Sequence, residues 1–334
     1  DFPAMLRAAI SEHRVSALAG ALRSPLVQYR LLLEALPRYR SLAAESATTI
    51  AGQRVRQIEL GLERLRWLPD LGSGPLIALN IPMFRLWAWD AVPSEGPPAV
   101  GTDAIVGRAL RTETPVFAEE LREVVFRPYW NVPRSILRNE VLPAIRRDPD
   151  YLRREDMEIV RGAGDNASRV GLTADALAEL ERGTLRVRQR PGPRNALGLV
   201  KFVMPNSENV YLHGTPAQAL FARSRRDFSH GCVRLADPIA MAEWVLRDRL
   251  EWTRDRIVAA TLGRETIHVT LPRPIKVILF YTTAAVMPED GAIRFADDLY
   301  RRDATLDRAL ASLHRLRTRA AVEVNSREVE VTHD

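Results

Sequence analysis

Residues 211–216 read Tyr-Leu-His-Gly-Thr-Pro, and residues 228–234 read Phe-Ser-His-Gly-Cys-Val-Arg. The second stretch holds the only cysteine of the chain, Cys232, and His213 precedes it by 19 residues. That separation lets the intervening chain loop out, so that two neighbouring strands bring the thiol and the imidazole together. A thiol nucleophile needs a base to form the thiolate, and a nearby imidazole is such a base. The two stretches therefore indicate a strand-rich domain with a cysteine nucleophile.

The neighbours of Cys232 suit the same chemistry. Gly231 lets the backbone approach a substrate closely, so the amides of Gly231 and Cys232 can point at a developing oxyanion. Arg234 would share a strand face with Cys232 and could pair with a substrate carboxylate. Tyr211 would face the same way as His213, where its hydroxyl contributes to the oxyanion site or its ring packs across strands.

Two other interpretations of the cysteine were weighed. A lone cysteine is usually a small core hydrophobe. A zinc site built from His213, His230 and Cys232 would need a compact second ligand pair, which the sequence does not supply. We therefore expect no metal and no cofactor.

Composition narrows the class of protein. The 334 residues carry 48 Lys and Arg against 42 Asp and Glu, a net charge of +6, and only Lys201 and Lys276 are lysines. Acids and bases are interleaved, so no basic patch suggests a nucleic-acid partner. No apolar run reaches the ~18 residues of a membrane span, and the first residues show no signal peptide.

The hydrophobic pattern changes period along the chain. It predicts that residues 4–41 are helical, with an interruption at Pro25 and a second apolar face that ends at Pro37. It predicts further helices at 51–67, 133–147, 173–182 and 237–250. It predicts short strands at 76–81, 84–89, 104–106, 185–190, 197–204, 208–212, 267–271 and 275–282.

We therefore expect an α+β protein in three parts. Residues 1–68 form a helical scaffold, and residues 76–300 form a mainly β catalytic domain with a helical lid insert at about 133–182. Residues 301–334 form a C-terminal helix and tail that return to the scaffold.

The chain resembles the L,D-transpeptidases, whose YkuD-type catalytic domain is a β-sandwich. Their His-Gly element and Ser-His-Gly-Cys-x-Arg element are here His213-Gly214 and Ser229 to Arg234. The larger Gram-negative wall-crosslinking members show further elements, which correspond here to Trp130–Pro133, Pro191–Gly198 and the helix Gln57–Trp67. The resemblance spans roughly residues 51–300.

The resemblance implies a reaction. Cys232 attacks the peptide bond before the terminal D-alanine of a peptidoglycan tetrapeptide stem, and an acceptor stem resolves the thioester to a 3→3 crosslink. His213 is the general base and later acid, and the Gly214 carbonyl orients its ring. Carbapenem-type β-lactams would acylate the thiol, and other wall-synthesis enzymes are further expected partners. The expected location is the periplasm or cell envelope.

Two alternative functions remain open on the same fold. The enzyme could hydrolyse instead of transfer, acting as an L,D-carboxypeptidase, or the chain could be a non-catalytic wall-binding scaffold. The resemblance also implies a small peptidoglycan-binding module just before the helix that begins at Ala51, where none is seen. Either the protein lacks this module or the module lies outside the given residues.

Further residues are expected to contact substrate. His230 lines the acceptor side or holds the loop, and Ser229 is a hydrogen-bonding loop residue more readily than a nucleophile. Trp130 and Asn131 form a substrate wall, unless Trp130 is only a buried anchor. Asn195 completes this set. The insert acts as a lid, with Gly162 to Gly164 as its hinge.

Overall fold

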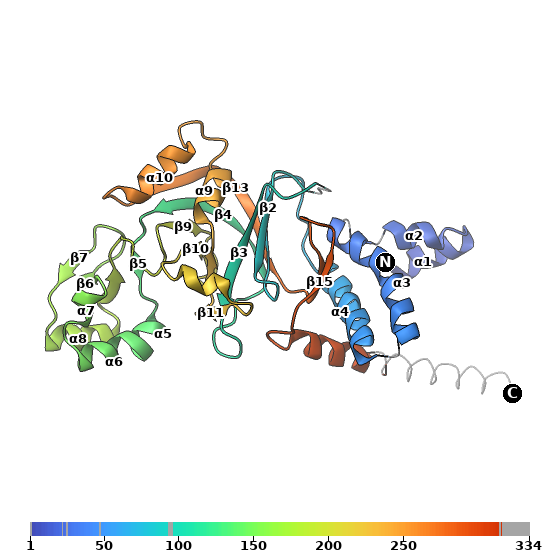
Figure 1. The fold of residues 1–334 in the computed structure, drawn as a ribbon, viewed down its shortest axis with the longest axis horizontal. Helices are drawn as coiled ribbons and strands as arrows, with labels where there is room; N and C mark the ends of the chain where they lie inside the picture. The colour runs from blue at the N-terminus through green and yellow to red at the C-terminus, as the bar shows by residue number, and fades with distance from the viewer. Residues whose placement is uncertain are drawn as a thin grey trace. The chain divides into compact units, whose positions relative to one another are not determined.

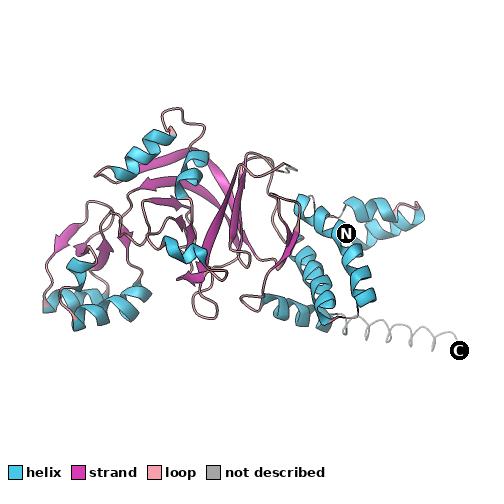
Figure 2. Cartoon of the chain, viewed as in Figure 1, coloured by secondary structure: helices cyan, strands magenta, loops and turns pink. Residues whose placement is uncertain are grey.

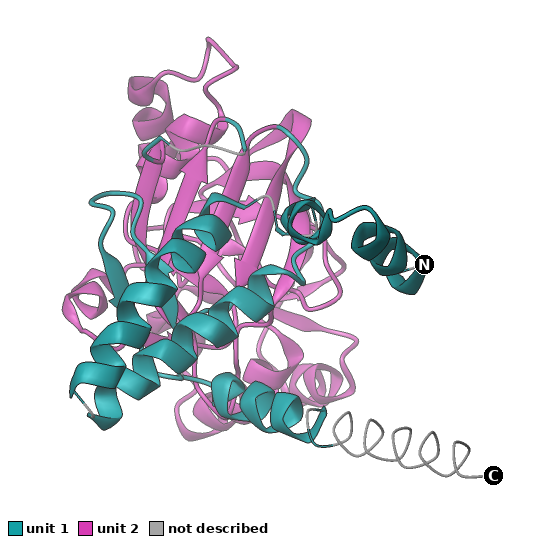
Figure 3. Cartoon of the chain, turned by 90° about the vertical axis from the view of Figure 1, so that its right-hand side faces the viewer, with its two compact units in different colours: residues 1–73, 91–97, 281–334 teal, residues 74–90, 98–280 magenta. Residues whose placement is uncertain are grey.

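The computed structural model describes residues 2–21, 23–24, 26–46, 48–92, 96–313 and 315. The chain divides into two compact units, which Figure 3 colours separately. The first consists of residues 1–73, 91–97 and 281–334, and the second of residues 74–90 and 98–280. Figure 2 shows that helices dominate the first unit and that the long strands belong to the second. The expected α+β class is confirmed.

The first unit is a helical scaffold with one small hairpin. Its elements are α1 (Phe2–Ser11), α2 (Val15–Ala21), α3 (Val27–Ser46), α4 (Thr49–Leu65), β14 (Ala284–Val286) and β15 (Ile293–Phe295), and residues 302–313 are also helical. The side-chain amide of Gln28 on α3 bonds both the N–H and the C=O of Val286, each at 2.8 Å. Residues 281–300, which we had assigned to the catalytic domain, are thereby grouped with the helices.

The start of the C-terminal segment contacts the same helices. Asp303 forms a largely buried ion pair with Arg64 of α4 and also accepts from Thr283. Residues 314 and 316–334 of the expected helix and tail lie outside the described residues.

Proline 37 does not end its helix, contrary to our expectation. It lies inside α3, which continues to Ser46. The residues after it make tertiary contacts: the ring of Tyr39 meets Phe295 edge-on, with centroids 5.3 Å apart. Such packing outweighs the one backbone hydrogen bond that a proline removes.

The second unit is built on a nine-stranded sheet in the order β11-β3-β12-β10-β9-β4-β13-β1-β2 (Figure 1). Its strands are β1 (Leu76–Asn80), β2 (Arg85–Trp89), β3 (Val100–Gly107), β4 (Phe117–Phe126), β9 (Val200–Val203), β10 (Leu212–His213), β11 (Asp227–Ser229), β12 (Val233–Leu235) and β13 (Ile267–Phe280). Pairing of β2 with β3 joins the two sides of the sheet, so it closes on itself. Closure shields strand edges and encloses fully buried residues such as Leu79, Leu86, Ile105 and Phe202.

Helices complete this unit: η2 (Gln218–Ala222), α9 (Pro238–Val245) and α10 (Arg254–Leu262). None of the helices in the described part of the chain is long and apolar enough to cross a bilayer.

The insert is a small α/β layer with its own core. It contains α5 (Arg134–Ile136), the π-helix η1 (Leu137–Val141), α6 (Leu142–Arg147), α7 (Tyr151–Arg154) and α8 (Ala174–Arg182). A second sheet, in the order β5-β8-β6-β7, joins them. Its strands are β5 (Trp130–Asn131), β6 (Met157–Arg161), β7 (Ser168–Val170) and β8 (Arg186–Gln189). The helices of the expected insert are present, and the strands β6 and β7 were not expected.

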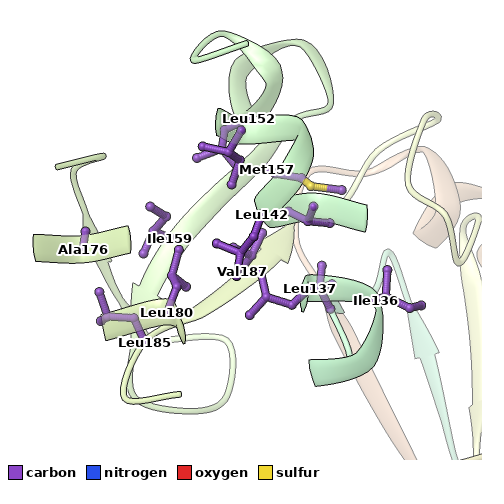
Figure 4. Close-up of a cluster of buried hydrophobic side chains, with 13 residues drawn as sticks. Ile136, Leu137, Leu142, Leu152, Met157, Ile159, Ala176, Leu180, Leu185 and Val187 are labelled. Atoms are coloured by element: carbon purple, nitrogen blue, oxygen red, sulfur yellow. The ribbon is translucent and has the colours of Figure 1, made fainter. Parts of the chain in front are cut away.

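Buried apolar side chains from both layers of the insert meet in one cluster (Figure 4). It includes Leu137 and Leu142 from the helices, Ile159 and Val187 from the sheet, and Leu180 from α8. Because Leu152, Met157 and Ile159 are members of this cluster, residues 150–170 contribute to the core of the insert.

The glycine cluster is not a hinge between the insert and the rest of the domain. Gly162 and Gly164 lie in the turn between the paired strands β6 and β7. Arg188 ties this turn down, because its Nη1 donates to the carbonyls of Gly164 and Asp165 at 3.0 and 2.9 Å. Its Nε also pairs with Glu158 at 2.7 Å, with both side chains buried.

Candidate active site

The two sequence stretches meet on adjacent parallel strands. In the register of β10 and β12, Leu212 lies opposite Val233 and His213 lies opposite Arg234. The N–H of Val233 donates to the carbonyl of Tyr211 at 3.1 Å. Side chains alternate along a strand, and laterally paired residues share a face. Tyr211, His213, Cys232 and Arg234 are therefore brought to one face, while Leu212 and Val233 enter the core.

The Cys232 thiol has two sets of neighbours. Its Sγ lies 3.7 Å from the carbonyl oxygen of Asn209, to which a thiol can donate. It also lies against the backbone N–H and the hydroxyl of Tyr211, which can donate to a thiolate. Burial raises the pKa of the thiol, and Tyr211, Lys201 and Arg234 oppose that rise. The resting group is a thiol with donors already placed for its anion.

His213 is held as a neutral ring. It is buried, and its Nδ1 lies 2.5 Å from the carbonyl oxygen of Gly214, the orientation we expected of that carbonyl. The carbonyl of Leu197 is a second backbone acceptor for the His213 ring. Burial and then the positive charge of Arg234 lower its pKa to about 3. No hydrogen bond joins the ring to the Cys232 thiol among the described residues, so the pair shares a face without direct contact. Such bonds often tighten only when substrate binds.

The turn before Cys232 is braced from within. The Ser229 hydroxyl is buried, donates to the Cys232 carbonyl at 2.5 Å and accepts from the Gly231 N–H at 3.1 Å. Gly231 has φ of +111°, a left-handed backbone that favours glycine. Ser229 therefore serves the loop. The Gly231 amide is already used by Ser229, whereas the Cys232 amide has no partner within the described residues and remains able to meet an oxyanion.

Thr114 braces the same turn from β3's side. Its hydroxyl donates to the Gly231 carbonyl and accepts from the Gly107 N–H, both at 2.8 Å, and the side chain is fully buried. A Cβ at Gly107 would lie 2.0 Å from the Thr112 carbonyl oxygen, so only glycine fits there. The Thr112 hydroxyl donates to the Ser229 carbonyl at 3.0 Å. The segment after β3 thus holds the turn before Cys232 by side-chain hydroxyls.

Two half-buried cations flank His213. Lys201 of β9 is paired with His213 in register, as Arg234 of β12 is on the other side. The Lys201 ammonium lies 4.2 Å from the centre of the Tyr211 ring. The Arg234 Nε is buried, and it has no hydrogen-bond partner among the residues that the structure describes. Burial lowers the pKa of both groups.

The insert contacts the site through His230 and Trp130. His230 Nε2 lies 2.8 Å from Oε1 of Glu140, which belongs to the π-helix of the insert. The Trp130 side chain hydrogen-bonds the Tyr211 hydroxyl. Asn131 follows on β5 and is exposed.

Asn195 lies away from the surface. It is 2% exposed, and its Nδ2 donates to the carbonyls of Pro128 and Arg190 at 3.1 and 3.0 Å. Its Oδ1 accepts from the Leu197 N–H at 2.8 Å. Asn195 therefore supports the loop that carries Leu197 past His213, and its side chain does not face a substrate in this structure.

Comparisons with known proteins agree with this geometry. The family model for the YkuD L,D-transpeptidase catalytic domain matches residues 75–269. The chain belongs to the L,D-transpeptidase family. A putative L,D-transpeptidase of Haemophilus influenzae is 30% identical over 281 residues, which are 84% of this chain and 54% of that protein. The chain thus spans about half the length of this curated relative.

Solved L,D-transpeptidases are more distant. L,D-transpeptidase 3 of Mycobacterium tuberculosis is 14% identical, with 63% of this chain and 62% of that chain covered and a TM-score of 0.29. The same enzyme with a faropenem-derived adduct gives 14% identity, 62% and 60% coverage, and a TM-score of 0.28.

Several residues of this L,D-transpeptidase domain were missed by the sequence analysis. Thr114 and Glu140 carry no local signal, because their contacts depend on segments 117 and 90 residues away. Lys201 did carry a local signal. It is one of only two lysines in a chain whose other basic residues are arginine, and it lies on a predicted strand before His213. Within the described residues no group of three His, Cys, Asp or Glu side chains is placed to hold a metal ion.

Proposed function

We propose that this domain is a peptidoglycan L,D-transpeptidase that forms 3→3 crosslinks through a thioester on Cys232. The observation that carries the proposal is the shared face of Tyr211, His213, Cys232 and Arg234 on β10 and β12. It supplies a nucleophile, a base, donors for an oxyanion and a cation for a carboxylate, which acyl transfer requires.

In the acylation step, His213 Nε2 takes the thiol proton and Sγ attacks the carbonyl carbon of the L,D peptide bond. The Nδ1 contact with the Gly214 carbonyl leaves Nε2 as the free acceptor. The Cys232 amide and the Tyr211 hydroxyl stabilise the oxyanion. The C–N bond then breaks, the leaving nitrogen takes the proton from His213, and D-alanine departs from the thioester.

In the second step, the side-chain amine of diaminopimelate on an acceptor stem attacks the thioester carbonyl. His213 accepts a proton from that amine, the C–S bond breaks, and the proton returns to Cys232. If water attacks instead, the product is a free tripeptide. Arg234 pairs with a substrate carboxylate, since its guanidinium is half-buried and its Nε lacks a partner.

The insert serves as a lid in this proposal. The Glu140–His230 contact joins it to the turn two residues before the nucleophile, and Trp130 joins it to Tyr211. A lid held in this way would retain the donor stem and keep water from the thioester until an amine arrives. Because the substrate is the cell wall, we propose that the protein acts in the periplasm or cell envelope.

The test is mass spectrometry of muropeptides after incubation with tetrapeptide-rich wall material, with Cys232→Ala as the matched control. Crosslinked dimers that appear with wild-type protein alone support transfer. Tripeptides without dimers would show hydrolysis instead, and unchanged muropeptides would contradict both activities and favour the scaffold.

A further inference from the structure

Lys201 occupies a row of side chains that crosses the sheet beside the nucleophile. In register, His268 of β13 lies opposite Val125 of β4, Val125 opposite Lys201 of β9, and Lys201 opposite His213 of β10. Arg234 continues the row on β12. Laterally paired residues share a face, so these side chains project from the same side of the sheet. Lys201 is therefore in the active-site row, although it lies 31 residues before Cys232 in the sequence.

Within the described part of the chain the two cations of this row form no ion pair, although Glu123 and Asp165 attract Lys201 from a longer distance. Among the described residues, no carboxylate oxygen lies within ion-pair distance of Lys201 or Arg234. Buried charges are normally paired, because the loss of hydration is costly without a counter-charge. His213 between them is neutral. The resting site thus holds two half-buried positive charges, which would stabilise a negative charge that forms beside them.

The Lys201 ammonium is positioned by Tyr211. It lies over the face of that ring at 4.2 Å from the centroid, an attractive cation–π geometry. The hydroxyl of the same ring is placed to donate to the Cys232 thiolate, and it thereby lowers the pKa of the thiol. A positive charge over the phenol ring makes its O–H a stronger donor, so the charge acts on the sulfur both directly and through Tyr211.

We propose that Lys201 is a positioning residue for the nucleophile: its ammonium, held on the Tyr211 ring, stabilises the Cys232 thiolate together with Arg234. Sγ can then carry negative charge beside a neutral His213, with the two cations in place of an imidazolium as counter-charge. In the free site the thiol proton leaves through His213 to solvent. In the acylation step described above, His213 holds that proton until it passes to the leaving nitrogen. No bond forms to Lys201 in either case. This inference rests on Cys232 being the nucleophile of the proposed function.

Other charged groups around Lys201 bear on the test. Glu123 on β4 and Asp165 on the insert attract the ammonium, and both are hydrogen-bonded to His268, at 2.8 Å from Nδ1 and Nε2 respectively. Tyr211 and His213 face it from β10, and Cys232 and Arg234 from the β12 side. If Lys201 served only to anchor Asp165, the loss of Asp165 and the loss of Lys201 would have the same effect.

The experiment measures alkylation of the single thiol across pH 6 to 10.5, with intact-mass readout. Lys201→Met keeps the length of the side chain and removes its charge. We expect the pH at which the alkylation rate inflects to rise by about one unit. At a pH below this inflection, alkylation should be about tenfold slower than in the wild type. Lys201→Arg should restore most of the wild-type profile. Lys276→Met, which removes the other lysine from an exposed position on β13, should leave it unchanged.

A second readout separates charge from structure. Anionic iodoacetate and neutral iodoacetamide alkylate the same thiol. The rate with iodoacetate divided by the rate with iodoacetamide therefore reports the positive potential around the thiol. Lys201→Met should lower that ratio severalfold, and Asp165→Asn should raise it or leave it unchanged. An unchanged inflection and ratio in a folded Lys201→Met protein, or a rise of the inflection in Asp165→Asn, would overturn the inference. No wall substrate is used, so the outcome is independent of whether crosslinks form.

Discussion

Replacing Thr114 by valine removes one buried hydroxyl while keeping the shape of the side chain. That hydroxyl links the Gly107 N–H and the Gly231 carbonyl, each at 2.8 Å, and the residue is fully buried. A buried backbone group left without a partner costs about 1–3 kcal/mol. Loss of the bond to the Gly231 carbonyl by itself predicts a loss of about 1–3 kcal/mol in the free energy of unfolding before the turn relaxes.

The same change should affect catalysis beyond its effect on stability. The Gly231 carbonyl belongs to the turn that carries the Cys232 amide, so relaxation of that turn misaligns the oxyanion donor. A displacement of about 1 Å at a reacting group can cost about 100-fold in rate. We therefore expect Thr114→Val to form crosslinked dimers at least tenfold more slowly, at a temperature where it remains folded.

The assay pairs chemical unfolding with dimer formation from tetrapeptide-rich wall material. Thr114→Ser is the matched control, since it keeps the hydroxyl and loses one buried methyl group, at about 1 kcal/mol. Its dimer rate should stay near wild type. If Thr114→Val unfolds at the wild-type denaturant concentration, or forms dimers at the wild-type rate, the hydroxyl does not hold the nucleophile turn.

Four further outcomes are expected. Cys232→Ala should remain folded and take up no carbapenem-type β-lactam in intact-mass measurements; an adduct on that variant would exclude the thiol as nucleophile. His213→Ala should slow thiol alkylation near pH 7 far more than above pH ~9, where the thiol ionises unaided, and equal losses would assign His213 to positioning. The pKa of His213 is lowered to about 3, so its stabilising effect is present above the unfolded value near 6.5 and is lost toward pH 3; a His213→Gln protein should show a smaller loss of unfolding free energy over that range. Glu140→Gln weakens the contact with His230 and should raise the ratio of tripeptide to dimer; an unchanged ratio would show that this contact does not hold the lid closed.

The strand pattern predicted much of the nine-stranded sheet but missed β4, β11 and β12. Strands at 76–80 and 85–89, and the strand at 186–189 in the insert, fall where short β-type runs predict them. Residues 117–126 read Phe-Ala-Glu-Glu-Leu-Arg-Glu-Val-Val-Phe, whose charges and spacing do not alternate cleanly. They form a strand because β13 and β9 pair along both of its edges, which is a tertiary effect.

The sequence motifs identified some residues of the candidate site and misassigned another. Cys232, His213 and Arg234 were recognised because they lie within one short motif and its upstream partner, and the β10–β12 register places them on one face. The motif that contains Asn195 predicts a substrate contact, yet the side-chain amide of Asn195 bonds the backbone of Pro128 and of Leu197. A motif marks which residues recur together and leaves open which of them face a substrate.

The sequence by itself determined the α+β class, the choice of the lone Cys232 and of His213 as candidate catalytic residues, and the family. These follow from residue types and short spacings, which are read along the chain. Only the tertiary structure decided that Lys201 stands beside His213, that Thr114 holds the nucleophile turn, and that Glu140 reaches His230. Strand register and loop contacts join residues far apart in sequence, and they are set by packing and hydrogen bonds across strands, so no local pattern encodes them.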